Sequence, residues 1–143
     1  ETETTESEME GDFEQEIGVS LAGSNIRSEP KYVAFLSQLL LLFQFCQFCK
    51  TDNPAVEVTE SGTNVTVKTR CHNVKCNKES AWHSQPFLPG SFIHAGNFLL
   101  PFSVILSGGS ATKTINMCKH MGLRCISLKT FFKHQRVSVM YVH

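Results

Sequence analysis

Four cysteines stand in two close pairs, and thiolate sulfur is a preferred ligand of zinc in proteins. Cys46 and Cys49 are separated by two residues, Cys71 and Cys76 by four, and 21 residues lie between the pairs. The second pair is wider than the usual two-residue spacing, and the segment between the pairs exceeds the common length of about 15–20 residues. Because two short loops joined by a hairpin can bring four thiolates into a tetrahedron, the pattern predicts one structural zinc site.

Spacing alone leaves other ligand sets and bonding states open. His72 or His83 can replace one thiolate, since imidazole also binds zinc. Alternatively, the cysteines form two disulfides or stay as buried free thiols, and the glycosylation motif that starts at Asn64 would suit a secreted protein of that kind. The short first loop and the lack of a signal peptide in the sequence favour an intracellular metal site.

A helix and a hairpin are expected to position the two cysteine pairs. Residues 31–45 follow a helix-start pattern and carry apolar side chains on a face so wide that the helix needs more than one neighbour. Alternating residues at 56–58 and 65–67 flank the turn residues 61–64 and predict a β-hairpin, and residues 81–84 add a third strand. Residues 95–106, 110–121 and 127–139 are expected to be helical.

These elements indicate an α+β fold: a small zinc-ribbon-like hairpin module flanked by an N-terminal helix and a C-terminal, helix-turn-helix-like region. We divide the chain into an acidic disordered segment (1–29), a helix plus zinc-ribbon-like module (30–89) and a basic helical region (90–143). The first 16 residues hold eight acidic side chains and almost no apolar ones, which is typical of disorder. No apolar run reaches the ~20 residues that a membrane span needs.

Charge is distributed unevenly along a chain whose net charge is +0. All thirteen acidic residues lie within residues 1–79, whereas residues 80–143 hold six lysines and arginines and five histidines. The C-terminal half is therefore expected to bind an anionic partner, either nucleic acid or the acidic segment of the chain itself. In the last helix, Leu128, Phe131, Phe132 and Val139 are expected to pack inward. The side chains left for DNA are Lys129, Lys133, His134 and Arg136.

The residues that several enzyme classes need are missing from the C-terminal half. Two-metal phosphoryl transfer needs clustered carboxylates and glycosidases need a carboxylate pair, yet residues 80–143 contain no acidic side chain. No nucleophile signature accompanies the histidines. Cys118 falls inside an apolar helical segment and Cys125 just after it. Both are assigned to the core, and a second metal site of Cys118, His120 and Cys125 is the alternative. We therefore expect a protein that is not an enzyme and has no small-molecule substrate.

The sequence from about residue 31 to 136 resembles transposase-derived proteins of fish genomes, some of which carry a THAP-type zinc finger. The most specific stretches are Trp82-His83-Ser84-Gln85-Pro86, Ala95-Gly96-Asn97-Phe98-Leu99-Leu100, Ile105-Leu106-Ser107-Gly108 and Cys125-Ile126-Ser127-Leu128-Lys129-Thr130-Phe131-Phe132-Lys133-His134-Gln135. The resemblance implies a cysteine-pair module and helices ahead of a nuclease-like core. Neither that core nor a THAP finger is present in this sequence, so strand transfer and sequence-specific binding are not carried over.

Together, the residues and the resemblance lead to one functional expectation. The chain is a non-catalytic fragment of a transposase-derived protein, stabilised by zinc, located in the nucleus and in contact with DNA. A zinc-dependent protein-interaction module is the first alternative, and a secreted disulfide-bonded domain is the second.

Overall fold

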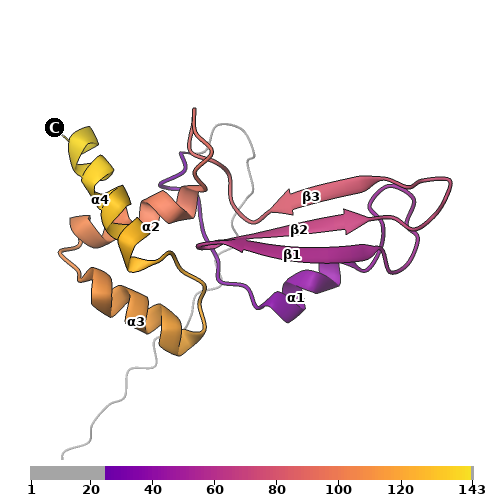
Figure 1. Ribbon diagram of the computed structural model, residues 1–143, viewed down its shortest axis with the longest axis horizontal. Coiled ribbons are helices and arrows are strands. Elements are labelled where there is room, and N and C mark those ends of the chain that lie inside the picture. The colour runs from indigo at the N-terminus through magenta and orange to yellow at the C-terminus, as the bar shows by residue number, and fades with distance from the viewer. Residues whose placement is uncertain (1–24, 143) are drawn as a thin grey trace, which may run out of the picture.

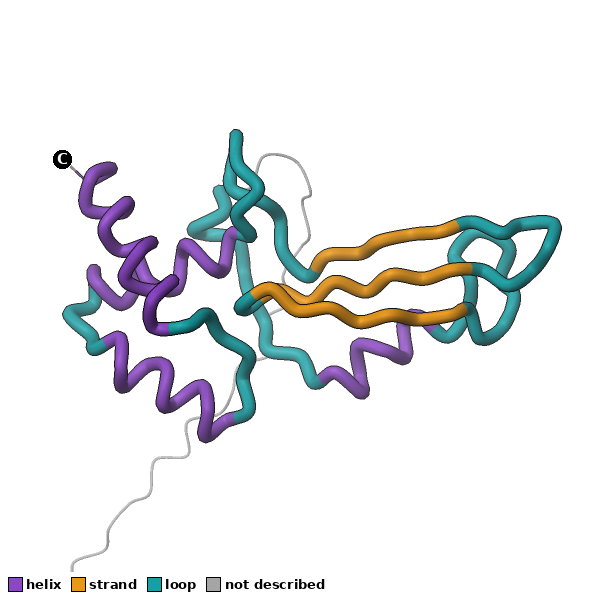
Figure 2. Tube along the Cα trace, in the orientation of Figure 1, coloured by secondary structure: helices purple, strands orange, loops and turns teal. Residues whose placement is uncertain are grey.

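A computed structural model describes residues 25–142, so most of the predicted acidic segment lies outside the described residues. The described chain confirms the α+β class, with a three-stranded antiparallel sheet and helices grouped mainly at one end of it (Figures 1 and 2). The elements are α1 (Leu36–Leu40), η1 (Leu41–Phe43), β1 (Ala55–Ser61), β2 (Asn64–Arg70), β3 (Glu79–His83), α2 (Ala95–Leu106), α3 (Ala111–Met121) and α4 (Leu128–Val142).

The sheet confirms the predicted hairpin and third strand, in the order β1-β2-β3. Ser61 pairs with Asn64, so the turn between β1 and β2 has only two residues. Gly62 occupies the first of these with φ +61°, as a type II′ hairpin turn requires of that position. The register places Val67 of β2 between Val58 of β1 and Trp82 of β3.

The sheet buries little of its own surface. Among the strand residues only Asn64, Thr66 and Val67 are buried, and all three belong to β2. The face of the sheet that carries Val67 meets η1, where the rings of Phe43 and Trp82 lie 5.7 Å apart. A three-stranded sheet with so small a core needs support from outside the sheet.

The N-terminal helix is shorter and far more exposed than predicted. Residues 31–35 are not helical, and no side chain of α1 or η1 is buried. Phe35 stands at the N-cap position, where it has no side-chain oxygen to accept the free amides of the first turn. The helical stretch ends before Phe45, because the backbone of Phe45 pairs with Asp52 as the first cysteine loop turns back.

The C-terminal helices are confirmed to within three residues at each end. Serine side chains define where α3 and α4 begin: Ser110 Oγ accepts a hydrogen bond from the amide of Lys113, and Ser127 Oγ accepts one from Thr130. The helices pack around a core of Val104, Ala111, Ile115, Ile126 and Phe131. No helix within residues 25–142 is long and apolar enough to cross a membrane.

The tip of the hairpin is fastened to the helical region by Asn97 of α2. Its Oδ1 accepts hydrogen bonds from the amide and the hydroxyl of Thr63, at 2.8 and 2.7 Å, and its Nδ2 donates to the carbonyl of Ser61 at 2.9 Å. Asn97 is buried, and a Cβ on Gly62 would stand only 2.5 Å from its Oδ1 and from Ile126. The glycine therefore permits the close approach that these hydrogen bonds need.

We predict that Asn97→Ala lowers the free energy of unfolding by about 1–3 kcal/mol, because it removes three hydrogen bonds from a partly buried place. Chemical denaturation followed by circular dichroism measures the effect. The matched control is Asn116→Ala on the exposed surface of α3, which should change stability by less than about 0.5 kcal/mol. Equal effects of the two substitutions would contradict the role given to Asn97.

Candidate metal centre

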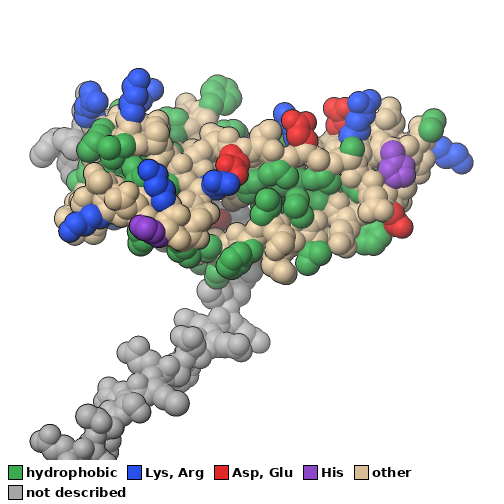
Figure 3. Space-filling model, turned by 60° about the horizontal axis from the view of Figure 1, so that its bottom comes forward, with side chains coloured by type: hydrophobic (Ala, Val, Ile, Leu, Met, Phe, Trp, Pro, Cys, Tyr) green, Lys and Arg blue, Asp and Glu red, His purple; other side chains and the backbone are tan. Residues whose placement is uncertain are grey.

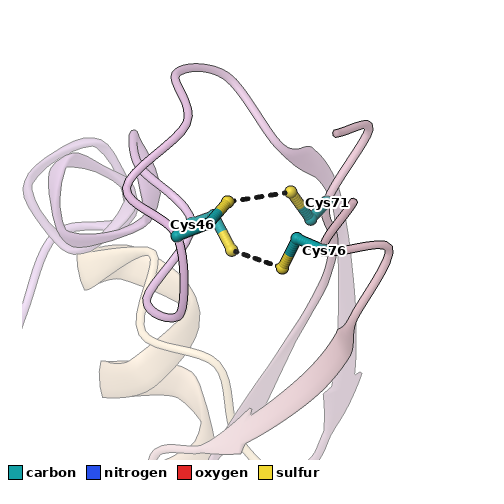
Figure 4. Close-up of side chains that lie close together, drawn as sticks. Cys46, Cys71 and Cys76 are labelled. Atoms are coloured by element: carbon teal, nitrogen blue, oxygen red, sulfur yellow. Dashed lines mark hydrogen bonds between the residues drawn. The ribbon is translucent and has the colours of Figure 1, made fainter. Parts of the chain in front are cut away.

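The sulfur atoms of the four predicted cysteine ligands converge at the end of the sheet that lies away from the helical region. One Sγ atom from each of Cys46, Cys49, Cys71 and Cys76 lies within 4.8 Å of the other three. The sulfurs of Cys46 and Cys76 are 3.9 Å apart, and those of Cys49 and Cys71 are 3.5 Å apart. Figure 4 labels Cys46, Cys71 and Cys76 and shows the first loop facing the second. A tetrahedron with metal–sulfur bonds of about 2.3 Å has edges of about 3.8 Å. The four sulfurs can therefore hold one metal ion.

The first loop turns tightly so that both of its sulfurs face the second loop. The amide of Lys50 donates to the carbonyl of Cys46, and the amide of Cys46 donates to the carbonyl of Thr51, each at 2.9 Å. Lys50 adopts φ +64°, which reverses the chain directly after the second cysteine of the pair. These contacts fix the positions of Cys46 and Cys49 relative to each other.

The second loop makes the same kind of turn, but the turn starts at Asn73, two residues after Cys71. The amide of Asn77 donates to the carbonyl of Asn73 at 2.8 Å, and Asn77 follows Cys76 with φ +44°. Cys71 precedes the turn by two residues and directly follows β2, and its amide donates to the carbonyl of Lys78 at 3.0 Å. This arrangement explains the four-residue spacing: the turn has the usual size, and the strand end supplies one of the two thiols.

Asn73 holds the two loops together, and sequence reasoning missed it. Its Nδ2 donates to Thr51 Oγ1 at 3.2 Å across the loops, and its Oδ1 accepts the amide of Lys75 at 3.0 Å. The amide of Asn73 also points at the sulfur of Cys71, at 3.4 Å. An asparagine inside a cysteine loop is a recognisable signal, because its side chain commonly closes such a turn on the backbone two residues on.

The first pair of thiols is easier to ionise than ordinary cysteines. Hydrogen bonds from the hydroxyl and the amide of Thr51 lower the pKa of Cys49 to about 6. The amides of Cys49 and Phe48 lower the pKa of Cys46. Both cysteines therefore favour the thiolate, which is the form that binds metals.

The second pair is harder to ionise while the cluster holds no cation. The amide of Asn73 favours the thiolate of Cys71, but partial burial and the neighbouring sulfurs outweigh it and raise the pKa to about 12. Partial burial and neighbouring sulfurs likewise raise the pKa of Cys76, against the effect of the Lys78 amide. Burial and hydrogen bonds among the sulfurs produce this split, and a divalent cation among them would favour the thiolate form of all four.

The structure does not bring either histidine into the sulfur cluster. His72 Nε2 lies 2.8 Å from the carbonyl oxygen of Asp52, where it links the two loops from outside. His83 Nδ1 lies 2.9 Å from the hydroxyl of Thr66 within the sheet. Among residues 25–142, the four cysteines form the one group of three or more metal-ligating side chains that could share an ion. This placement supports the four-cysteine set over the mixed one.

The remaining two cysteines lie with the apolar core, as predicted. Cys118 is 1% exposed, and Cys125 packs against the core cluster. Burial, together with the nearby Cys118, raises the pKa of Cys125 to about 11, so this thiol is unreactive. The asparagine of the glycosylation motif is buried as well: Asn64 is 1% exposed, and its Nδ2 donates to Thr66 Oγ1 at 3.1 Å.

The predicted nucleic-acid contacts divide into exposed and buried side chains. Lys129, Lys133 and Arg136 are exposed on α4. His134 is only 9% exposed and meets the ring of Phe98 edge-on, so the prediction that it lies on the solvent face is wrong. Its pKa is lowered by burial first and by Lys133 second.

The inward face of α4 accounts for this correction. Phe131, His134 and Ser138 are all buried, and their spacing of three and four residues places them on one side of a helix. Phe132 and Leu128, which were expected to pack inward, are 43% and 40% exposed. The face of α4 that points to solvent therefore mixes lysine and arginine with exposed apolar side chains.

Comparison with known proteins identifies no relative of this chain. No protein-family model matches it, and no curated protein or solved structure is significantly similar to it. The geometry of the residues themselves therefore carries the functional argument.

We predict that all six cysteines are free thiols. The chain, denatured with a metal chelator and without reductant, should then release six thiols to a colorimetric thiol reagent. A count of two would mean that the four clustered cysteines form disulfides, and it would contradict the metal centre. Mass spectrometry of the alkylated chain assigns the reacting residues.

Proposed function

We propose that Cys46, Cys49, Cys71 and Cys76 bind one zinc ion in a zinc-ribbon-like module and that the ion is structural. The observation that carries this proposal is the spacing of the sulfurs. All four lie within 4.8 Å of one another, and two of the separations, 3.5 and 3.9 Å, are close to the edge of a zinc–thiolate tetrahedron, about 3.8 Å. Four protein ligands fill a tetrahedral ion, so no position stays open for water or a substrate. The proposed site is therefore not catalytic.

The weak core of the sheet supports a structural role for the ion. Only three strand residues are buried, and the two cysteine loops are joined to each other mainly through Asn73, Thr51 and His72. A structural zinc ion contributes about 10–16 kcal/mol of apparent binding free energy, and where the site forms only on folding that energy stabilises the fold. The ion would hold the two cysteine loops together at the end of the sheet that lies away from the helices.

The protein as purified should contain one zinc ion per chain by elemental analysis. Sharing about 10–16 kcal/mol among four ligands gives about 3 kcal/mol each, so Cys71→Ser should weaken zinc binding by about 100-fold. The matched control is Cys125→Ser, which changes a partly buried cysteine outside the cluster and should leave the zinc content unchanged.

Removal of the ion provides a second readout. A strong chelator should lower the thermal midpoint of the wild-type chain, and it should lower that of Cys71→Ser by a smaller amount, because the variant gains less stability from its weaker zinc binding. Iron bound in place of zinc would be visible by its absorption, because zinc–thiolate sites have no visible band. A chain that folds equally well with and without metal would refute the structural role.

We also propose that the exposed cations of α3 and α4 contact the phosphate backbone of DNA. Helices α2–α4 contain no carboxylate side chain, and Figure 3 shows separate blue side chains among green and tan ones at the helical end. Arg124 is ion-paired with Glu60 at 3.2 Å, whereas Lys129, Lys133 and Arg136 extend from α4 into solvent. The resemblance to transposase-derived proteins supports DNA as the anion and the nucleus as the location, and both remain part of the proposal.

The double substitution Lys129→Ala and Lys133→Ala should weaken binding to duplex DNA similarly for all sequences. If each lysine contacts one phosphate, the slope of log K against log salt should decrease by about 2. Fluorescence anisotropy at several salt concentrations measures both quantities. Lys68→Ala on the open face of the sheet is the control. Binding that does not respond to salt would favour the protein-interaction alternative instead.

A further inference from the structure

An uncharged apolar segment at residues 32–48 lies on the surface of the protein. Its sequence contains no acidic or basic residue. Six of its large side chains, Tyr32, Phe35, Leu36, Leu41, Leu42 and Phe45, are between 48% and 79% exposed. Figure 3 shows hydrophobic side chains gathered in the middle of the molecule, where α1 lies. The width of this apolar face predicted a helix with more than one neighbour, and residues 25–142 provide a single neighbour, the sheet.

The sheet holds this segment in place from one side only. Phe43 packs against Trp82, and Gln47 Nε2 donates to Ser80 Oγ at 2.6 Å. Leu39 and Leu40 are half-buried. Nothing within residues 25–142 covers the opposite side, so the exposed leucines of α1 and η1 are presented on an element that the sheet anchors.

The exposed area reaches the lower end of what a specific interface buries, about 1,200 Å² over both partners. An aromatic side chain covers about 150–250 Å², so the rings of Tyr32, Phe35 and Phe45, exposed to 79%, 77% and 54%, present about 400 Å². The three exposed leucines raise the total to about 600 Å². The largest apolar patch on a typical monomer is about 300–600 Å², and each partner in a stable complex buries about 800 Å².

We propose that a second copy of this chain covers the segment and that the protein is a symmetric dimer. A two-fold axis brings the same patch of both partners into contact. This arrangement is favourable here because the patch carries no charge, so no like charges face each other across the interface. A membrane surface fits the segment less well, because interfacial helices carry a lysine- and arginine-rich polar face that residues 32–48 lack. This proposal depends on neither the zinc nor the DNA proposal.

Sedimentation equilibrium of the full chain over a range of concentrations tests the proposal. The expected result is a reversible equilibrium that reaches twice the 16.0 kDa of one chain. Leu42→Glu places two unpaired charges in the interface and should raise the dissociation constant about 100-fold or more. Leu42 is 75% exposed, so the change should leave the monomer fold intact. The matched control is Phe92→Glu, which alters a 93% exposed ring in the loop before α2 and should have no effect.

Hydrogen exchange locates the interface independently of the variants. The amides of α1 and η1 should exchange more slowly as the concentration of the chain rises. A monomer at every concentration would overturn the proposal and leave residues 1–24 or a different protein as the occupant. A dimer that Leu42→Glu does not weaken, or a monomer that binds lipid vesicles through this segment, would overturn it as well.

Discussion

Four sulfur atoms held within 4.8 Å of one another are the constraint on which the rest of the ribbon depends. In the absence of a cation, burial and the neighbouring sulfurs raise the pKa of Cys71 and of Cys76. The loops nevertheless aim amides and hydroxyls at the sulfurs of Cys46 and Cys49, which favours the charged form. The local backbone is thus arranged for thiolates, and the charge balance is completed only by a metal.

The opposite end of the sheet is held by neutral hydrogen bonds. Asn97 satisfies the polar groups of the hairpin turn in a buried position, where such bonds are costly to break. The neighbouring ion pair of Glu60 and Arg124 is largely exposed and contributes much less. The two anchors differ in chemistry, so reagents that act on one, such as chelators, should leave the other intact.

Local sequence signals predicted most of the elements but not the contacts between them. Strand alternation predicted the hairpin and apolar periodicity predicted the C-terminal helices, because each signal lies within a few residues of its effect. Asn97 lies 34 residues from Thr63, and a long-range polar contact of this kind leaves no periodic pattern. The position of His134 was predictable, since it lies three residues after Phe131 on the same face. The N-terminal segment shows a different limit. A wide apolar face indicates that a helix packs against several neighbours, but it does not identify those neighbours.

The central strand sets a fixed distance between the two halves of the molecule. β2 is hydrogen-bonded on both sides, begins at the turn that Asn97 holds and ends directly before Cys71. Seven residues of extended chain span about 23 Å. The strand therefore works as a rigid spacer. A partner that binds the helices and the cysteine loops at the same time must match that separation.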